Sequence, residues 1–177
     1  MRSTMPHIAL NIAQIVEYGR TIHGRTPVTS WNSDGPETTT FSAIAARASA
    51  LAHALRDELG IDGDQRIATL MYNCAEHFEV FLGVASMGAV FQPLNKQLMP
   101  DQIVHIINHA DDQVIIADPT EIELLAEVLP HCPRVRAVII IGIGDLSDVA
   151  EQLPDGIPWY SYAVSYTHLT LPTNREV

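Results

Sequence analysis

The 177-residue sequence is poor in cysteine and in positive charge. Its two cysteines, Cys74 and Cys132, lie far apart, which argues against a secreted disulfide framework and favours a reducing cytoplasm. Ten Lys and Arg stand against 21 Asp and Glu, giving a net charge of -11. Such a chain is poorly suited to bind a nucleic-acid backbone or an anionic membrane surface.

Long apolar runs are also missing. The residues before Gly19 contain no continuous apolar core of the kind found in signal peptides. The most apolar stretch, VRAVIIIGI at 135–143, is too short to cross a bilayer. With 47% hydrophobic and 18% charged residues, the composition is that of an ordinary folded protein, and we expect it in the cytoplasm.

The signatures of common catalytic sites are absent from the sequence. Lys96 is the only lysine, and it lies in LNKQ, so no glycine-rich phosphate loop ending in G-K-[ST] is present. No G-x-S-x-G nucleophile motif occurs. We therefore predict no catalytic, cofactor-binding or metal-binding residue in this chain.

Two further patterns do not meet the physical requirements of a site. In VIIIGIGDLSD, Gly142 and Gly144 follow a predicted strand, but Ser147 replaces the third glycine and Asp145 would repel a phosphate. We interpret this stretch as a turn that ends a strand. Cys74 and Cys132 have no activating partner at a recognisable spacing, so we expect inert thiols.

A third pattern places Asp101, His105 and His109 four residues apart, on one face of a predicted helix. Two histidines at this spacing can share a metal ion. No second cluster of ligands accompanies them, so we interpret the face as an exposed polar stripe.

The amino-terminal third predicts a helix, a hairpin and a second helix. Residues 11–24 have Ile12, Ile15 and Val16 on one side of a short helix, and 27–41 form two strand-like stretches around turn dipeptides. A long helix follows over 40–60. We expect Thr40 to cap it and Gly60 to end it, with an apolar stripe at three- and four-residue intervals formed by Ile44, Ala48, Leu51, Leu55 and Leu59.

From residue 66 onward strands and helices alternate, which predicts an α/β fold: a parallel sheet with helices on both faces. We expect Asn73 to cap the first helix, Pro93 to end the second strand and Pro100 to lie in the first turn of a helix. The expected strands are 66–72, 89–95, 113–119 and 134–142, and the expected helices are 75–88, 99–112 and 120–132.

Two stretches resemble the beginning of the AMP-forming acyl-CoA synthetases, the adenylate-forming superfamily. The first is TTTFSAIAARASALAHALRDELGIDGDQRIATLMYN, and the second is FEVFLGVASMGAVFQPLNKQLMPDQIVHIINHADDQVIIAD. The correspondence runs from about Trp31 to Tyr162, and MGAVFQPLN followed by IINHADDQVIIAD is similar to medium- and long-chain fatty-acyl-CoA synthetases. One departure is Ala43, which stands where the family commonly has a Glu that completes a capping box with the Thr.

The resemblance implies an enzyme that uses Mg2+ and ATP to convert a fatty acid to an acyl-adenylate, and then forms the thioester with coenzyme A. It also implies a possible homodimer of the parent protein. The phosphate loop, nucleotide contacts and adenylation lysine of the family lie beyond the matched region. We therefore expect the fragment to be inactive and to need no cofactor itself.

We expect residues 1–163 to be the incomplete amino-terminal part of the large adenylate-forming domain. The resemblance implies that 151–163 form a linker leading to a short helix. Residues 164–177 begin VSYTHLTLPT, which resembles a translated sequencing adapter, so we interpret them as a non-native tail. The same residues partly alternate and could also form a strand. The alternative function is a stand-alone α/β module that binds a small ligand at the end of its sheet.

Overall fold

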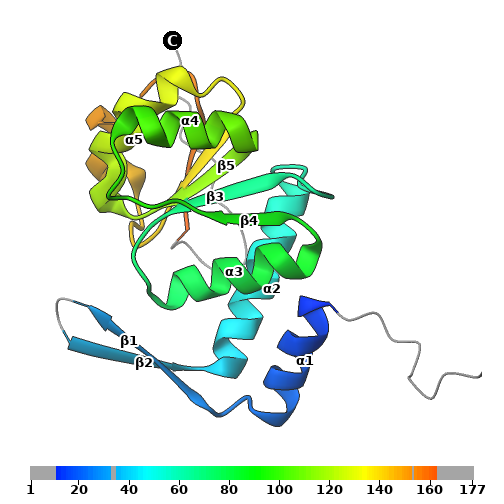
Figure 1. Cartoon of the computed structure of the whole chain (residues 1–177). Helices are drawn as coiled ribbons and strands as arrows, with labels where there is room; N and C mark the ends of the chain where they lie inside the picture. Colours follow the sequence, from blue (N-terminus) through cyan, green and yellow to red (C-terminus); the bar gives the residue numbers. More distant parts are fainter. Residues whose placement is uncertain (1–10, 33–34, 153, 163–177) are drawn as a thin grey trace, which may run out of the picture.

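The computed structural model describes residues 11–32, 35–152 and 154–162. A five-stranded parallel sheet with helices on both faces forms the main body (Figure 1). A two-stranded hairpin and one helix lie at the opposite end of the molecule, and the hairpin projects away from the body. The predicted α/β fold class is confirmed. The predicted tail, residues 164–177, lies outside the described residues.

The first helix, α1 (Ile12–Ile22), begins where predicted. The side chain of Asn11 caps it by accepting a hydrogen bond of 3.0 Å from a backbone N–H of the first turn. Ile12 and Val16 pack against the two helices that follow. Ile15 was expected on the same side, but it is 62% exposed, because it points away from those helices.

The predicted hairpin is confirmed. Strand β1 (Pro27–Asn32) pairs antiparallel with β2 (Gly35–Thr40), and Asn32 lies opposite Gly35. The predicted turn includes residue 34, which lies outside the described residues. Most side chains of both strands are exposed, so the hairpin adds little to the core.

Helix α2 (Phe41–Asp57) also matches its prediction. The Thr40 side chain accepts a hydrogen bond of 3.3 Å from the backbone N–H of Ala43, as expected of an N-cap. Gly60 ends the helical segment with a φ of 59°, a backbone conformation that glycine adopts without strain. All five residues of the predicted apolar stripe are buried: Ile44, Ala48, Leu51, Leu55 and Leu59.

The sheet has the order β4-β3-β5-β6-β7, and each neighbouring pair is parallel. Apolar residues fill β3, β5 and β6 because both faces of these strands are covered. Four strands were predicted, with ends that differ by a few residues from those observed, and Pro93 does end its strand. The strands are β3 (Arg66–Leu70), β4 (Val90–Pro93), β5 (Asp112–Ala117), β6 (Ala137–Ile140) and β7 (Trp159–Ser161).

Strand β7 was not predicted. A linker and a short helix were expected over 151–163. This prediction is wrong at Trp159–Ser161, which form a buried strand that pairs in parallel with β6. A three-residue strand is too short to show a periodic pattern. The connection from β6 to β7 contains a short 3-10 helix at Leu146–Gln152.

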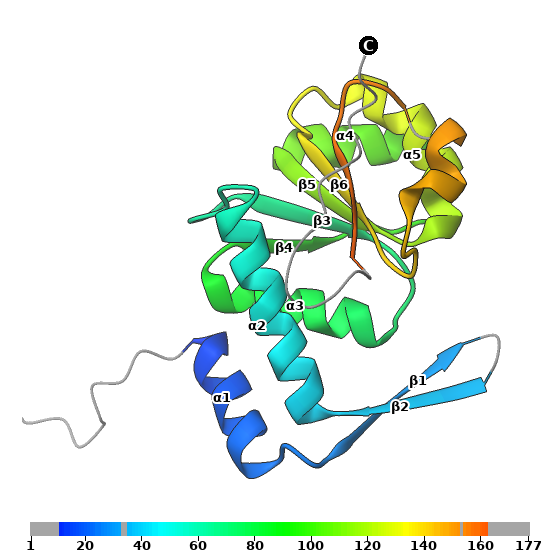
Figure 2. The ribbon, with the colours of Figure 1, turned by 180° about the vertical axis from the view of Figure 1, so that it is seen from behind.

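The helices cover both faces of the sheet (Figure 2). Helices α2 and α3 (Ala75–Met87) pack on one face, and α4 (Pro100–Ala110) and α5 (Ile122–Val128) pack on the other. Pro100 lies in the first turn of α4, as predicted. The predicted helix 120–132 is divided, because α5 is flanked by short 3-10 helices, Pro119–Glu121 and Leu129–His131.

The predicted cap of α3 is wrong by one residue. The helix begins at Ala75, so Cys74 and not Asn73 holds the capping position. The Cys74 backbone is extended and its carbonyl accepts the helical hydrogen bond from Phe78 at 3.3 Å, but its side chain makes no capping bond. At the other end, Gly88 ends α3 with a φ of 92°.

Candidate functional site

The order of the strands creates a change of winding direction between β3 and β5. The chain that leaves β3 enters α3 on one face, whereas the chain that leaves β5 enters α5 on the other face. In open parallel sheets, ligands bind at the carboxyl ends of the strands where two such connections diverge. The segments after β3, β4 and β5 are therefore the first place to seek a site.

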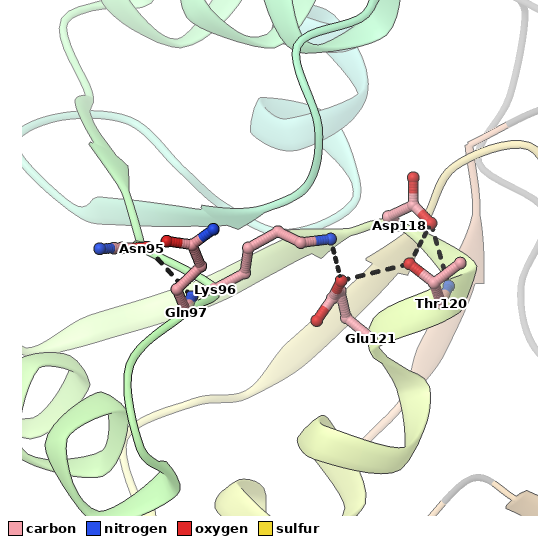
Figure 3. A network of polar contacts seen from close by, with 6 residues as sticks. All are labelled: Asn95, Lys96, Gln97, Asp118, Thr120 and Glu121. Atoms are coloured by element: carbon pink, nitrogen blue, oxygen red, sulfur yellow. Dashed lines mark hydrogen bonds and ion pairs between the residues drawn. The ribbon is translucent and has the colours of Figure 1, made fainter. Parts of the chain in front are cut away.

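Lys96 occupies the centre of this edge (Figure 3). It follows β4, and its ammonium forms an ion pair with Glu121, which follows β5. The same ammonium lies 3.1 Å from the ring centroid of Tyr72, just after β3. Three neighbouring strand ends are thus connected through the single lysine of the chain.

Burial of the Lys96 ammonium lowers its pKa, but its interactions with Glu121 and Tyr72 together outweigh this effect, so the pKa of Lys96 is raised. The side chains of Lys96 and Glu121 are 22% and 10% exposed. The pair is therefore partly shielded from water, where ion pairs contribute more than at an open surface.

Asp118 and Thr120 extend the network beyond Glu121 (Figure 3). Asp118 Oδ1 accepts hydrogen bonds from the backbone N–H of Thr120 at 3.0 Å and from its hydroxyl at 2.7 Å. Thr120 Oγ1 also lies 3.2 Å from Glu121 Oε1. The contacts hold the turn after β5 in one conformation and orient the carboxylate that faces Lys96.

This edge does not fit a triphosphate. Its only ammonium is already paired with Glu121, so a bound anion would have to displace that carboxylate. Nor do the described residues bring together three His, Cys, Asp or Glu side chains that could hold a metal ion.

The glycine-containing turn after β6 does not fit a phosphate either. Gly142 has a φ of 70°, but the following helix is a short 3-10 helix. The carboxylate of Asp145 accepts the backbone N–H of Ser147 at 2.9 Å, and this hydrogen bond lowers the pKa of Asp145. A negative charge therefore already occupies the position that an anion would need.

Asp101, His105 and His109 lie on the exposed face of α4, as the sequence predicted. The rings of His105 and His109 stack with their centroids 5.8 Å apart. Ile103 and Ile107 on the opposite face are buried. The arrangement matches the interpretation of a polar stripe on an amphipathic helix.

Both cysteines are free thiols in environments that disfavour the reactive thiolate. Burial raises the pKa of Cys74 to about 12 and that of Cys132 to about 11. These shifts support the expectation of inert thiols.

A second polar cluster was missed by sequence reasoning. Glu79 of α3 is 1% exposed and forms an ion pair with Arg47 of α2. The hydroxyl of Tyr162, just after β7, donates to Glu79 Oε2 at 2.8 Å. Burial raises the pKa of Glu79, and these two partners partly offset the rise. The cluster ties β7 to the helices on one face of the sheet.

The sequence matches the protein family described as "AMP-binding enzyme" over residues 20–162. It is 30% identical over 166 residues to a 3-methylmercaptopropionyl-CoA ligase of Ruegeria pomeroyi, covering 93% of this chain and 30% of the relative. It is 32% identical over 155 residues to a medium-chain-fatty-acid–CoA ligase of Ectopseudomonas oleovorans, covering 87% and 28%. The chain thus spans less than a third of these relatives.

Solved structures share the same fold. An anthranilate CoA ligase in complex with anthranoyl-AMP has a TM-score of 0.70 at 20% identity, covering 89% of this chain and 30% of the other. A benzoate CoA ligase from Burkholderia xenovorans has a TM-score of 0.64 at 24% identity, covering 75% and 26%. At such identities the likeness shows the fold alone.

Proposed function

The chain belongs to the family of AMP-binding enzymes, and on that premise we propose that it is the amino-terminal part of a fatty-acyl-CoA ligase. The parent would activate a fatty acid with ATP as acyl-AMP and transfer the acyl group to coenzyme A. The observation that carries this proposal is the similarity to CoA ligases along 93% and 87% of the chain.

We propose a scaffold role for this part of the ligase. In the described residues, the polar groups at the carboxyl edge of the sheet bind one another, and the glycine turn carries its own acidic cap. ATP, Mg2+ and coenzyme A would therefore be held by other parts of the parent. Residues 1–163 would be part of the AMP-binding domain, and 164–177 would be a non-native tail.

An ATP–pyrophosphate exchange assay tests the scaffold role directly. The 177-residue chain should show no exchange with a medium- or long-chain fatty acid, because the described residues at the sheet edge are not fitted to a triphosphate. Exchange above the blank, measured with no other nucleotide-binding protein added, would overturn this part of the proposal.

A chimera tests the family role separately. Residues 20–162 would replace the matching segment of the Ectopseudomonas oleovorans ligase, and acyl-CoA formation would be measured. A folded chimera should form medium-chain acyl-CoA, with the unaltered ligase as control. A chimera that melts like the control but makes no product would contradict the proposal.

Sequencing the genomic DNA downstream of the codon for Ala163 tests the boundary. A reading frame that continues into a Ser/Thr/Gly-rich segment ending in Lys would support the ligase and identify 164–177 as foreign. A natural frame that encodes 164–177 and then stops would instead support the second candidate.

The second candidate is a stand-alone module that binds a small ligand where the winding direction changes. The observation that favours it is the convergence of Tyr72, Lys96 and Glu121 at that edge. Because the ammonium is already paired, we rank this candidate below the ligase.

The ligase proposal has two further parts. The parent would form a homodimer, and it would lie in the cytoplasm, a location that suits two free cysteines.

A further inference from the structure

Asp112 is the most anomalous buried group among the described residues. It is the first residue of β5, in the centre of the sheet, and it is 0% exposed. Neither carboxylate oxygen has a hydrogen-bond partner. A buried carboxylate without donors is costly if it is charged, so the neutral acid is strongly favoured in this position.

The backbone at Asp112 departs from regular pairing. Arg66 of β3 lies opposite Asp112, but the next residue of β3 lies opposite Val114, so Gln113 is an extra residue in β5. The carbonyl of Gln113 accepts a hydrogen bond of 2.9 Å from the backbone N–H of Arg136. Such irregularities weaken a ladder locally, and this one places the weak point beside the buried carboxyl group.

Two charged groups act on Asp112 from the elements around it, and one thiol is affected by its charge. The charge of Arg66, on β3, favours the carboxylate, although it forms no ion pair with it among the described residues. Asp111, at the end of α4, disfavours the carboxylate, and its own charge is engaged by Arg134 at 2.7 and 2.9 Å. Cys132, which follows α5, is 1% exposed and feels the charge of Asp112.

We propose that the protonated side chain of Asp112 keeps the amino edge of the sheet closed, and that its ionisation opens this edge. On opening, the start of β5 separates from its neighbours and the carboxylate reaches water and Arg66. Cys132 is uncovered at the same time. This pH-dependent opening concerns the amino edge of the sheet, whereas Lys96 lies at the carboxyl edge. It does not depend on the proposed ligase activity.

The pH range follows from the burial of Asp112, which raises its pKa from 3.8 to about 7. The folded chain therefore holds this proton more tightly than the unfolded chain. The resulting stability is fully present below about pH 4 and is lost as the pH rises through about 7. Opening should thus increase as the pH rises from about 4 through about 7 and then level off.

Thiol labelling of Cys132 measures the opening. In a Cys74→Ala background, the labelling rate of Cys132 would be measured at each pH with Asp112 intact and with Asp112→Asn. Dividing the first rate by the second cancels the pH dependence of the labelling reaction itself. This ratio should rise about tenfold between roughly pH 5.5 and 8.5. Simple electrostatics predicts the opposite trend, because an ionised Asp112 raises the pKa of Cys132.

Asp111→Asn is the matched control. It removes the neighbouring charge and should keep the same rise in the labelling-rate ratio with pH as the wild-type side chain. A ratio that stays constant with pH would overturn the proposal. If Asp112→Asn does not fold, infrared titration of the wild-type chain gives an independent answer. A protonated-carboxyl band that disappears near pH 7 supports the proposal, whereas one that disappears near pH 4 contradicts it.

Discussion

Arg47 of α2 forms an ion pair with Glu79 of α3, and this pair joins the two helices. Glu79 is almost fully buried, whereas the Arg47 side chain is 21% exposed. The hydroxyl of Tyr162 completes the surroundings of the carboxylate. The arrangement makes Glu79 the partner whose loss should matter most.

Replacing Glu79 by Gln should lower the free energy of unfolding by about 3 kcal/mol, because the guanidinium of Arg47 loses its charge partner. The value lies at the low end for buried pairs because Arg47 can reach water. Urea unfolding of the chain measures the change. Glu17→Gln breaks the exposed pair with Arg20 and should change little, and an equal effect of both variants would contradict the prediction.

Replacing Thr40 by Ala should cost about 1 kcal/mol, because the backbone N–H of Ala43 loses its capping acceptor. Thr40→Ser keeps the hydroxyl and should remain close to the wild type. The midpoints of urea unfolding compare the two. Equal losses in both variants would show that packing of the threonine methyl group, and not capping, accounts for the cost.

Replacing Gly83 by Ala should destabilise the contact between α2 and α3. A Cβ at this position would lie 2.7 Å from the backbone oxygen of Ala48, which cannot move aside as a side chain could. Overpacking of this kind costs about 1–3 kcal/mol, whereas the helix propensity of alanine returns about 1 kcal/mol. We expect a net loss in thermal melting. Gly63→Ala, where the nearest atom is 3.7 Å away, should be nearly neutral.

Because Lys96 is the only lysine, amine acylation reports on one side chain besides the amino terminus. Glu121→Gln should lower the raised pKa of Lys96, which increases the fraction of free amine at a given pH. A change of one pKa unit is about a tenfold change in that fraction. Peptide mass spectrometry should find Lys96 labelled several-fold faster in this variant.

Glu123→Gln is the control for the lysine experiment, since Glu123 is exposed on α5 and lies outside the described network of Lys96, Glu121 and Thr120. It should leave the labelling rate unchanged. A rate in Glu121→Gln equal to the wild-type rate would mean that the ion pair does not hold the ammonium in solution.

Elements with strong periodicity could be predicted from the sequence. The apolar stripe of α2 and the β-branched strands β5 and β6 follow directly from local patterns, because burial repeats along each element. Strand β7 could not be predicted in this way. Its three residues join the sheet only because β6 offers a free edge beside them.

The buried polar clusters could not be predicted from the sequence for a different reason. A glutamate in an amphipathic helix is ordinarily exposed, so nothing local marks Glu79 as buried. Its partners Arg47 and Tyr162 are distant in sequence and meet it only in the folded chain. Asp112 is similar, because its neighbours from β3 and from the segment after α5 become visible only in three dimensions. The stripe of Asp101 and His105, formed within one helix, was by contrast predicted correctly.

The strand order also bears on how the chain folds as it leaves the ribosome. Strand β3 can pair with β4 on one side soon after both are made, but its other side waits for β5, which is synthesised later. Until then, a half-finished nascent sheet exposes the apolar side chains of β3 and α3. This interval is the stage of biosynthesis at which the polypeptide most needs protection by a chaperone.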